Sequence, residues 1–143
     1  MDLKDKILDV IRGQKLASVA TIAEESDQIL PAVRYMQATG SEDLTLSAFT
    51  KIDTRKVSQI EKNPNVALMI ASEGGPTKPY VAIRATAEVH KDPEMKRMLW
   101  GPHLEKFIKD PEDPKFVAIR FIPSRIEYYI GGKMEVLQHH LAE

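Results

Sequence analysis

Two cations and a hydroxyl stand together at Thr54, Arg55 and Lys56, directly before a segment that is predicted to be a helix. The first turn of a helix has backbone N–H groups without intrahelical partners and a partial positive charge, and both favour an anion. Arginine binds phosphate through paired hydrogen bonds, and lysine adds a point charge. The spacing therefore favours a phosphate-binding corner, and the alternative is that Arg55 and Lys56 are ordinary solvated charges. Thr50 and Lys51, at the end of the preceding predicted strand, add another hydroxyl and another cation.

Other residue types that commonly do chemistry are sparse. The chain has no cysteine, which excludes disulfides, thiolate nucleophiles and cysteine-ligated metals. The histidines are His90, His103, His139 and His140. They show no convincing ligand spacing with a carboxylate, so the sequence predicts no metal site. GxGxxG and Walker-type loops are also absent from the sequence, and any redox chemistry here requires a bound cofactor.

The elements that position the corner follow from hydrophobic periodicity and turn signals. Helices are predicted over residues 3–11, 55–62 and 93–100, with a further short helix over 103–108. Strands are predicted by β-prone runs over residues 16–23, 30–38, 44–49, 66–71, 80–89, 116–122 and 125–130. This pattern indicates an α+β fold built mainly on antiparallel strands.

Two of the predicted strands differ in how apolar residues are distributed over their two faces. Residues 66–71 are apolar at every position, which predicts a strand near the centre of the sheet that is covered on both sides. In residues 80–89 the odd positions are apolar, whereas Tyr80, Arg84, Thr86 and Glu88 share the other face. One face of this strand is therefore expected to be core and the other wet or functional.

Length and charge limit the range of functions. A chain of 143 residues is long enough for one core, and we expect a single domain over residues 1–143. The formal net charge of -1 provides no general attraction to a polyanion, so nucleic acid is not an expected partner. Charged residues interrupt the N-terminal segment, and no later apolar run is long enough to cross a membrane, so we expect a cytoplasmic protein.

The stretch from Phe49 to Leu68 resembles the signature of the pyridoxamine-phosphate-oxidase-like FMN-binding split barrels. In that family a strand, Thr-Asn, Ser-Arg-Lys, a short helix, Asn-Pro and a buried strand follow in this order, and the order and spacing here agree. Residues 98–102 with the late strands resemble the short, general-stress-protein branch. The resemblance covers nearly the whole chain. It implies a six-stranded split β-barrel with peripheral helices, and a homodimer with FMN at the subunit boundary.

The resemblance also implies where the cofactor binds. Its cofactor-binding positions correspond to Arg34, Tyr35, Met36, Thr50, Lys51, Thr54, Arg55, Lys56, Tyr80 and Trp100. The triplet at 54–56 matches the phosphate-binding residues, and residues 34–36 match the strand that borders the flavin ring. Lys51 and Tyr80 replace the usual Asn and Gln, which affects contacts to the ring. Trp100 is placed near the dimer cleft, with core packing as its alternative role.

The implied function is an FMN-dependent oxidoreductase that acts on a small molecule, with no dedicated acid or base visible in the sequence. One alternative is a non-catalytic protein that binds or senses a flavin or a tetrapyrrole. Another is a reductase that uses the deazaflavin F420. Genuine pyridoxamine phosphate oxidase activity is not expected, because the chain is short and no segment matches that enzyme's C-terminal substrate-binding region.

Overall fold

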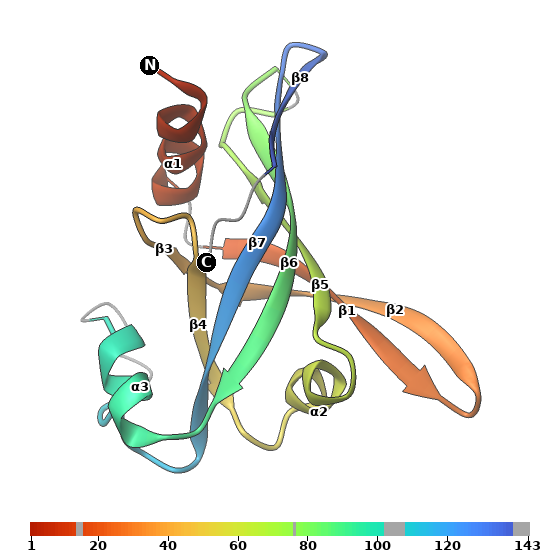
Figure 1. Cartoon of the computed structure of the whole chain (residues 1–143), viewed down its shortest axis with the longest axis vertical. Coiled ribbons are helices and arrows are strands. Elements are labelled where there is room, and N and C mark those ends of the chain that lie inside the picture. The colour runs from red at the N-terminus through yellow and green to blue at the C-terminus, as the bar shows by residue number, and fades with distance from the viewer. Residues whose placement is uncertain (14–15, 76, 102–107, 139–143) are drawn as a thin grey trace.

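The computed structural model of the chain describes residues 1–13, 16–75, 77–101 and 108–138. In these ranges eight strands form one antiparallel sheet with three helices around it (Figure 1). The helices are α1 (Leu3–Gly13), α2 (Arg55–Lys62) and α3 (Pro93–Leu99). The strands are β1 (Leu16–Glu25), β2 (Gln28–Gln37), β3 (Thr39–Gly40), β4 (Leu46–Lys51), β5 (Asn65–Ala71), β6 (Tyr80–His90), β7 (Phe116–Ile130) and β8 (Lys133–Gln138). The predicted α+β, mainly antiparallel fold is confirmed.

The strand order brings distant parts of the chain side by side. The sheet runs β2-β1-β5-β6-β7-β4-β3, with β8 paired to β7. β4 therefore pairs with β7, far along the chain, and not with the hairpin of β1 and β2 that precedes it. The sheet is strongly twisted, and that hairpin projects from the other strands (Figure 1). The described strand pairs leave the sheet open at β2 and β3.

Helix α2 forms where the sequence predicts it. Val57 and Ile60 are three residues apart, so they share one face, and both are buried. Thr54 is the N-cap with an extended backbone, and Asn63 ends the helix, where its N–H donates to the Gln59 carbonyl oxygen at 2.8 Å. The buried face packs against β1 and β6, which fixes the helix at the end of β4.

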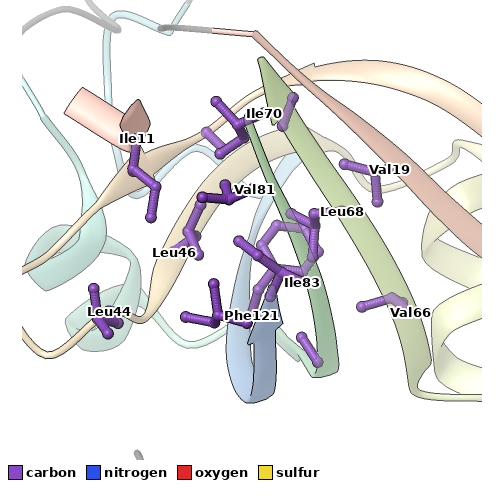
Figure 2. Close-up of a cluster of buried hydrophobic side chains, with 14 of the residues drawn as sticks. Ile11, Val19, Leu44, Leu46, Val66, Leu68, Ile70, Val81, Ile83 and Phe121 are labelled. Carbon is purple, nitrogen blue, oxygen red and sulfur yellow. The ribbon is translucent and has the colours of Figure 1, made fainter. Parts of the chain in front are cut away.

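The core lies on the inner face of the sheet. Figure 2 shows side chains from several strands and from α1 meeting there, among them Ile11, Leu68, Ile83 and Phe121. Phe121 is fully buried, and burying a side chain of this size stabilises the folded state by about 1.5–3 kcal/mol. The alternation predicted for β6 is confirmed over most of the strand, because the odd positions from Val81 to Ala87 are buried, and Val89 is half-buried.

The second face of β5 differs from the prediction. Val66, Leu68 and Ile70 are buried, but the alternate residues Ala67, Met69 and Ala71 are exposed. The strand does lie within the sheet, between β1 and β6. The prediction of cover on both sides is therefore wrong for the described part of the single chain, since the three helices found there leave this apolar face open.

The late strands also differ in detail from the predicted set. Residues 116–122 and 125–130, predicted as two strands, are one strand, β7, because a bulge absorbs Ser124 between the pairs Ala85–Pro123 and Arg84–Arg125. Strands β3 and β8 were not predicted, so the sheet has two strands more than the six expected. Most of the predicted helix over 103–108 lies outside the described residues. His103, His139 and His140 lie outside them as well. None of the described helices is long and apolar enough to cross a lipid bilayer.

Candidate functional site

The C-terminal ends of β2 and β4 and the first turn of α2 meet around a cavity of about 310 Å³. The predicted residues Tyr35, Met36, Thr50, Lys51 and Lys56 all line it. They come from three separate elements, and the fold brings them together because β4 leads directly into α2. The cavity is at the small end of the range for ligand pockets in proteins.

The cavity has apolar walls that the sequence analysis did not identify. Phe49, Ile108 and Phe116 line it together with Met36. Phe116 lies there because it pairs with Lys51 across β7 and β4. Aromatic and aliphatic walls beside two lysines suit a ligand that has a flat apolar part and an anionic end.

The predicted residue Arg34, on β2, does not line the cavity, but it lies close enough to Lys56 to act on its charge and is held by a polar network. Its Nη1 donates to Thr21 Oγ1 at 2.6 Å, and its Nη2 donates to Gln59 Oε1 at 3.0 Å. Thr21 Oγ1 donates to Gln59 Oε1 at 2.6 Å, so each of the three side chains is hydrogen-bonded to the other two. Gln59 lies one turn after Lys56 on α2, which places the guanidinium beside the start of that helix.

Thr21 and Gln59 hold the predicted site residue Arg34, and the sequence analysis did not identify either of them. Thr21 occupies a core position of β1, between Val19 and Ala23, and it is 2% exposed. A buried hydroxyl must find a hydrogen-bond partner, so a polar residue within an apolar alternation was the available signal. The partner itself is 38 positions away, which no local pattern reveals.

The corner around Lys56 carries unbalanced positive charge. Burial lowers the pKa of the Lys56 ammonium, and the nearby Arg34 guanidinium lowers it further. No acidic residue stands in the first turn of α2. Two neighbouring cations without a carboxylate in this turn form a region that an anion would stabilise.

The other two members of the predicted phosphate triplet are placed differently. Thr54 makes no side-chain cap to α2, and its hydroxyl donates to the Lys51 carbonyl oxygen at 2.9 Å. Arg55 lines a separate hollow of about 100 Å³ with Glu24 and Glu25, on the side of α2 that faces β1. The structure therefore brings Lys56 into the cavity but leaves Arg55 outside it.

Tyr80 and Trp100 are also not among the residues that line the cavity. Tyr80 begins β6, whereas the opposite end of that strand, at His90, pairs beside the start of β7. With a rise of about 3.3 Å per residue, Tyr80 is separated from that end by roughly 30 Å. Trp100 follows α3, and its indole N–H is buried without a hydrogen-bond partner among the described residues. No cluster of three or more potential metal-ligating side chains occurs in the described ranges.

Comparison with known proteins gives consistent matches over most of the chain. A family model described as pyridoxamine 5'-phosphate oxidase matches residues 3–130. General stress protein 26 of Bacillus subtilis (strain 168) is 30% identical over 133 residues, which cover 92% of this chain and 91% of that protein. The crystal structure of general stress protein 26 from Bacillus anthracis str. Sterne has a TM-score of 0.75 at 28% identity, covering 96% of this chain and 100% of the other.

A more distant match shares the fold alone. The structure of a heme binding protein from Mycobacterium smegmatis has a TM-score of 0.77 at 12% identity, covering 96% of this chain and 58% of the other. With the closer matches, it confirms the split-barrel architecture expected from the sequence.

Proposed function

Because the chain belongs to the pyridoxamine 5'-phosphate oxidase family, we propose that it is a flavoprotein that binds FMN in the cavity between β2, β4 and α2. The proposed activity is the oxidation or reduction of a small molecule through the flavin. One observation carries this proposal: Arg34 and Lys56 form a cationic corner beside a cavity walled by Phe49 and Phe116. An anionic end joined to a planar aromatic ring is the chemistry of FMN.

The residues at the corner fit the phosphate of FMN. Arg34 and Lys56 would bind it with charge-assisted hydrogen bonds, and the N-terminal N–H groups of α2 would add backbone donors. Thr50, which is 8% exposed, places a hydroxyl in the same cavity. Arg55 remains a predicted phosphate ligand, and this role requires its side chain to leave the hollow beside Glu24.

The remaining walls fit the ring of the cofactor. Tyr35 and Met36 border the cavity from β2, and Phe49 and Phe116 border it from β4 and β7. When bound, the flavin supplies hydride or electron transfer, and the protein supplies orientation, electrostatics and exclusion of water. In this proposal Lys51, at the rim of the cavity, places a positive charge beside the ring.

The exposed face of the sheet supports the proposed homodimer. Its cross-strand rows run Tyr35–Ser18–Met69–Ala82–Glu127 and Val33–Ala20–Ala67–Arg84–Arg125. The middle of both rows consists of small residues and Met69. Val33, Tyr35 and Met69 are 70%, 74% and 46% exposed. A contiguous apolar face of this kind is typical of a protein interface, and we propose that a second copy of the chain covers it.

The dimer would also explain the position of Tyr80. The exposed face has β2, with the cavity residue Tyr35, on one flank and Tyr80 on β6 on the other. A two-fold axis along β5 exchanges these flanks, so Tyr80 of one copy would lie over the β2 end of the other copy. In this arrangement each cavity takes residues from both copies.

The oligomeric state tests this part of the proposal. Light scattering after size exclusion should give twice the mass of the chain, and Met69→Glu should shift the mass toward one chain and weaken FMN binding. Lys91→Glu, which alters an exposed residue paired with Glu61, is the control and should leave the dimer intact. If the wild-type protein stays monomeric when it is saturated with FMN, the proposal that each cavity takes residues from both copies is wrong.

A second candidate function is non-catalytic storage or sensing of a planar cofactor. The match to a heme binding protein of the same fold favours this candidate. Protein purified from its own host, denatured and analysed by mass spectrometry, identifies the bound chromophore as FMN, a deazaflavin or a tetrapyrrole. FMN supports the proposal, and either of the others contradicts it. Stopped-flow reduction by NAD(P)H and reoxidation by candidate substrates then separates an enzyme from a binder.

A further inference from the structure

The rings of Tyr80 on β6 and Tyr129 on β7 are stacked. Their centroids are 4.7 Å apart, and the angle between the ring planes is 9°. The two residues are paired across the strands, and both are half-buried on the face that the proposed dimer covers. Within the described residues the Tyr80 hydroxyl has no hydrogen-bond partner, so the stack is what fixes the orientation of its ring.

Tyr129 is itself held in place by charged neighbours. Its hydroxyl donates to Glu127 Oε1 at 2.9 Å, and Glu127 Oε2 accepts from Arg125 Nε at 2.9 Å. The carboxylate thus joins a tyrosine and an arginine on the same face of β7. Arg84, opposite Arg125 on β6, adds a second positive charge near this carboxylate. A ring tied by its hydroxyl to an ion pair has fewer orientations open to it than a free tyrosine ring.

We infer that Tyr129 and Glu127 are positioning residues, which hold the Tyr80 ring as the wall that each copy contributes to the cofactor cavity of the other. The inference rests on the proposed function, because it needs FMN in the cavity and a second copy on the exposed face. It goes beyond that function by assigning roles to Glu127 and Tyr129, which do not line the cavity of their own chain. One face of the Tyr80 ring is stacked on Tyr129, and in this inference the other face packs against the planar ring of the cofactor, an arrangement favourable for aromatic groups.

The fluorescence of bound FMN tests this inference, because a tyrosine ring in contact with a flavin quenches its emission. In the full-length dimer, Tyr80→Leu and Tyr129→Leu should both raise the yield of bound FMN, by similar factors. Tyr129→Phe keeps the stack and loses the bond to Glu127, and Glu127→Gln removes the charge. Both should raise the yield less than Tyr129→Leu. The loss of one aromatic contact should also weaken FMN binding by about two- to tenfold.

Tyr128→Phe is the matched control, since Tyr128 is the next residue on β7 and its ring is buried on the opposite face. It should leave both the yield and the affinity at wild-type values. If Tyr80→Leu raises the yield but Tyr129→Leu and Glu127→Gln do not, the positioning role is overturned while FMN binding stands. If Tyr129→Leu fails to fold, Tyr129→Phe and Glu127→Gln still decide the outcome. If the wild-type protein binds no FMN, the proposed function fails, and this inference fails with it.

Discussion

Arg34 on β2 and Gln59 on α2 are joined by a hydrogen bond of 3.0 Å, from Nη2 of the guanidinium to Oε1 of the amide. This bond ties a strand of the projecting hairpin to the helix that begins the proposed phosphate corner. It also keeps the guanidinium near Lys56, where burial lowers the pKa of that lysine and the charge of Arg34 lowers it further. The two cations of the corner are therefore arranged before any ligand binds.

Gln59→Leu should weaken FMN binding, because it removes an acceptor that orients Arg34. A hydrogen bond to a charged group contributes about 1.5–3 kcal/mol at most, and the partial exposure of Arg34 reduces this, so we expect roughly a three- to tenfold weaker affinity. Equilibrium titration with FMN measures it. Ser58→Ala, on the neighbouring surface of α2, should bind FMN as the wild type does. Equal affinities of Gln59→Leu and the wild type would remove the positioning role of Gln59.

Lys56→Met and Arg55→Met separate the contributions of the two basic residues of the triplet to FMN binding. Only Lys56 lines the cavity, so Lys56→Met should lower the affinity for FMN more than Arg55→Met does. Riboflavin lacks the phosphate, and its affinity should change little in either variant. Isothermal titration with both ligands gives the comparison. A larger loss in Arg55→Met would mean that the Arg55 side chain turns toward the phosphate, as the sequence predicts.

The affinity for FMN should fall as the pH rises. This fall should occur at a lower pH than it would if Lys56 had the pKa of an ordinary lysine. Burial, and then Arg34, lower the pKa of Lys56, and the protonated ammonium is the form that attracts the phosphate. Affinity is therefore lost as pH rises through this lowered pKa, below the usual value of about 10.4. Bound phosphate favours the ammonium, so FMN binding should raise the pKa of Lys56 and take up protons.

Titrations with FMN at increasing pH check this prediction, and Lys56→Arg is the control because arginine keeps its charge. The same shift acts on stability with a defined sign. The unfolded chain binds more protons at Lys56 than the folded chain between the two pKa values, so the free energy of unfolding without ligand should rise with pH in that window. If Lys56→Arg shows the same loss of affinity as the wild type, Lys56 is not the titrating group.

Much of the site could be predicted from local sequence, and the rest depends on long-range contacts. Thr50, Lys51 and Lys56 were found because a strand end and a helix start follow one another in the chain. Phe116 was not found, because it reaches the cavity through the pairing of β7 with β4, which no local pattern encodes. The position of Arg55 depends on the angle of the side chain around α2, which the triplet motif does not determine.

The same distinction holds for the fold. The helices and six of the strands follow from periodicity within short windows. The open face of β5 was missed because Met69 and its neighbours are as apolar as a core strand, and sequence alone does not say whether a helix or a second copy covers them. β8 was also missed, and its residues, such as Met134 and Glu135, show little of the alternation in burial that a period-two sequence pattern reflects.

Lys96→Met should destabilise the protein, although Lys96 lies on a short helix outside the cavity. The Lys96 side chain is 1% exposed, and its Nζ donates to the carbonyl oxygens of Asp113 at 2.9 Å and Phe116 at 3.1 Å. Its loss leaves these carbonyls without that donor, at a cost of about 1–3 kcal/mol in the free energy of unfolding. Urea unfolding measures this value, and Lys91→Met, at an exposed ion pair, should change it by less than about 1 kcal/mol. Equal stability of the two variants would contradict a stabilising role for the hydrogen bonds from Lys96 to these two carbonyls.

A crystal structure of the protein with bound FMN tests the central claim most directly. We expect the phosphate within hydrogen-bond distance of Lys56 and Arg34, and the flavin ring between the walls of the cavity and Tyr80 of a second copy. An FMN molecule bound elsewhere, with the side chains of Lys56 and Arg34 in solvent, would contradict it.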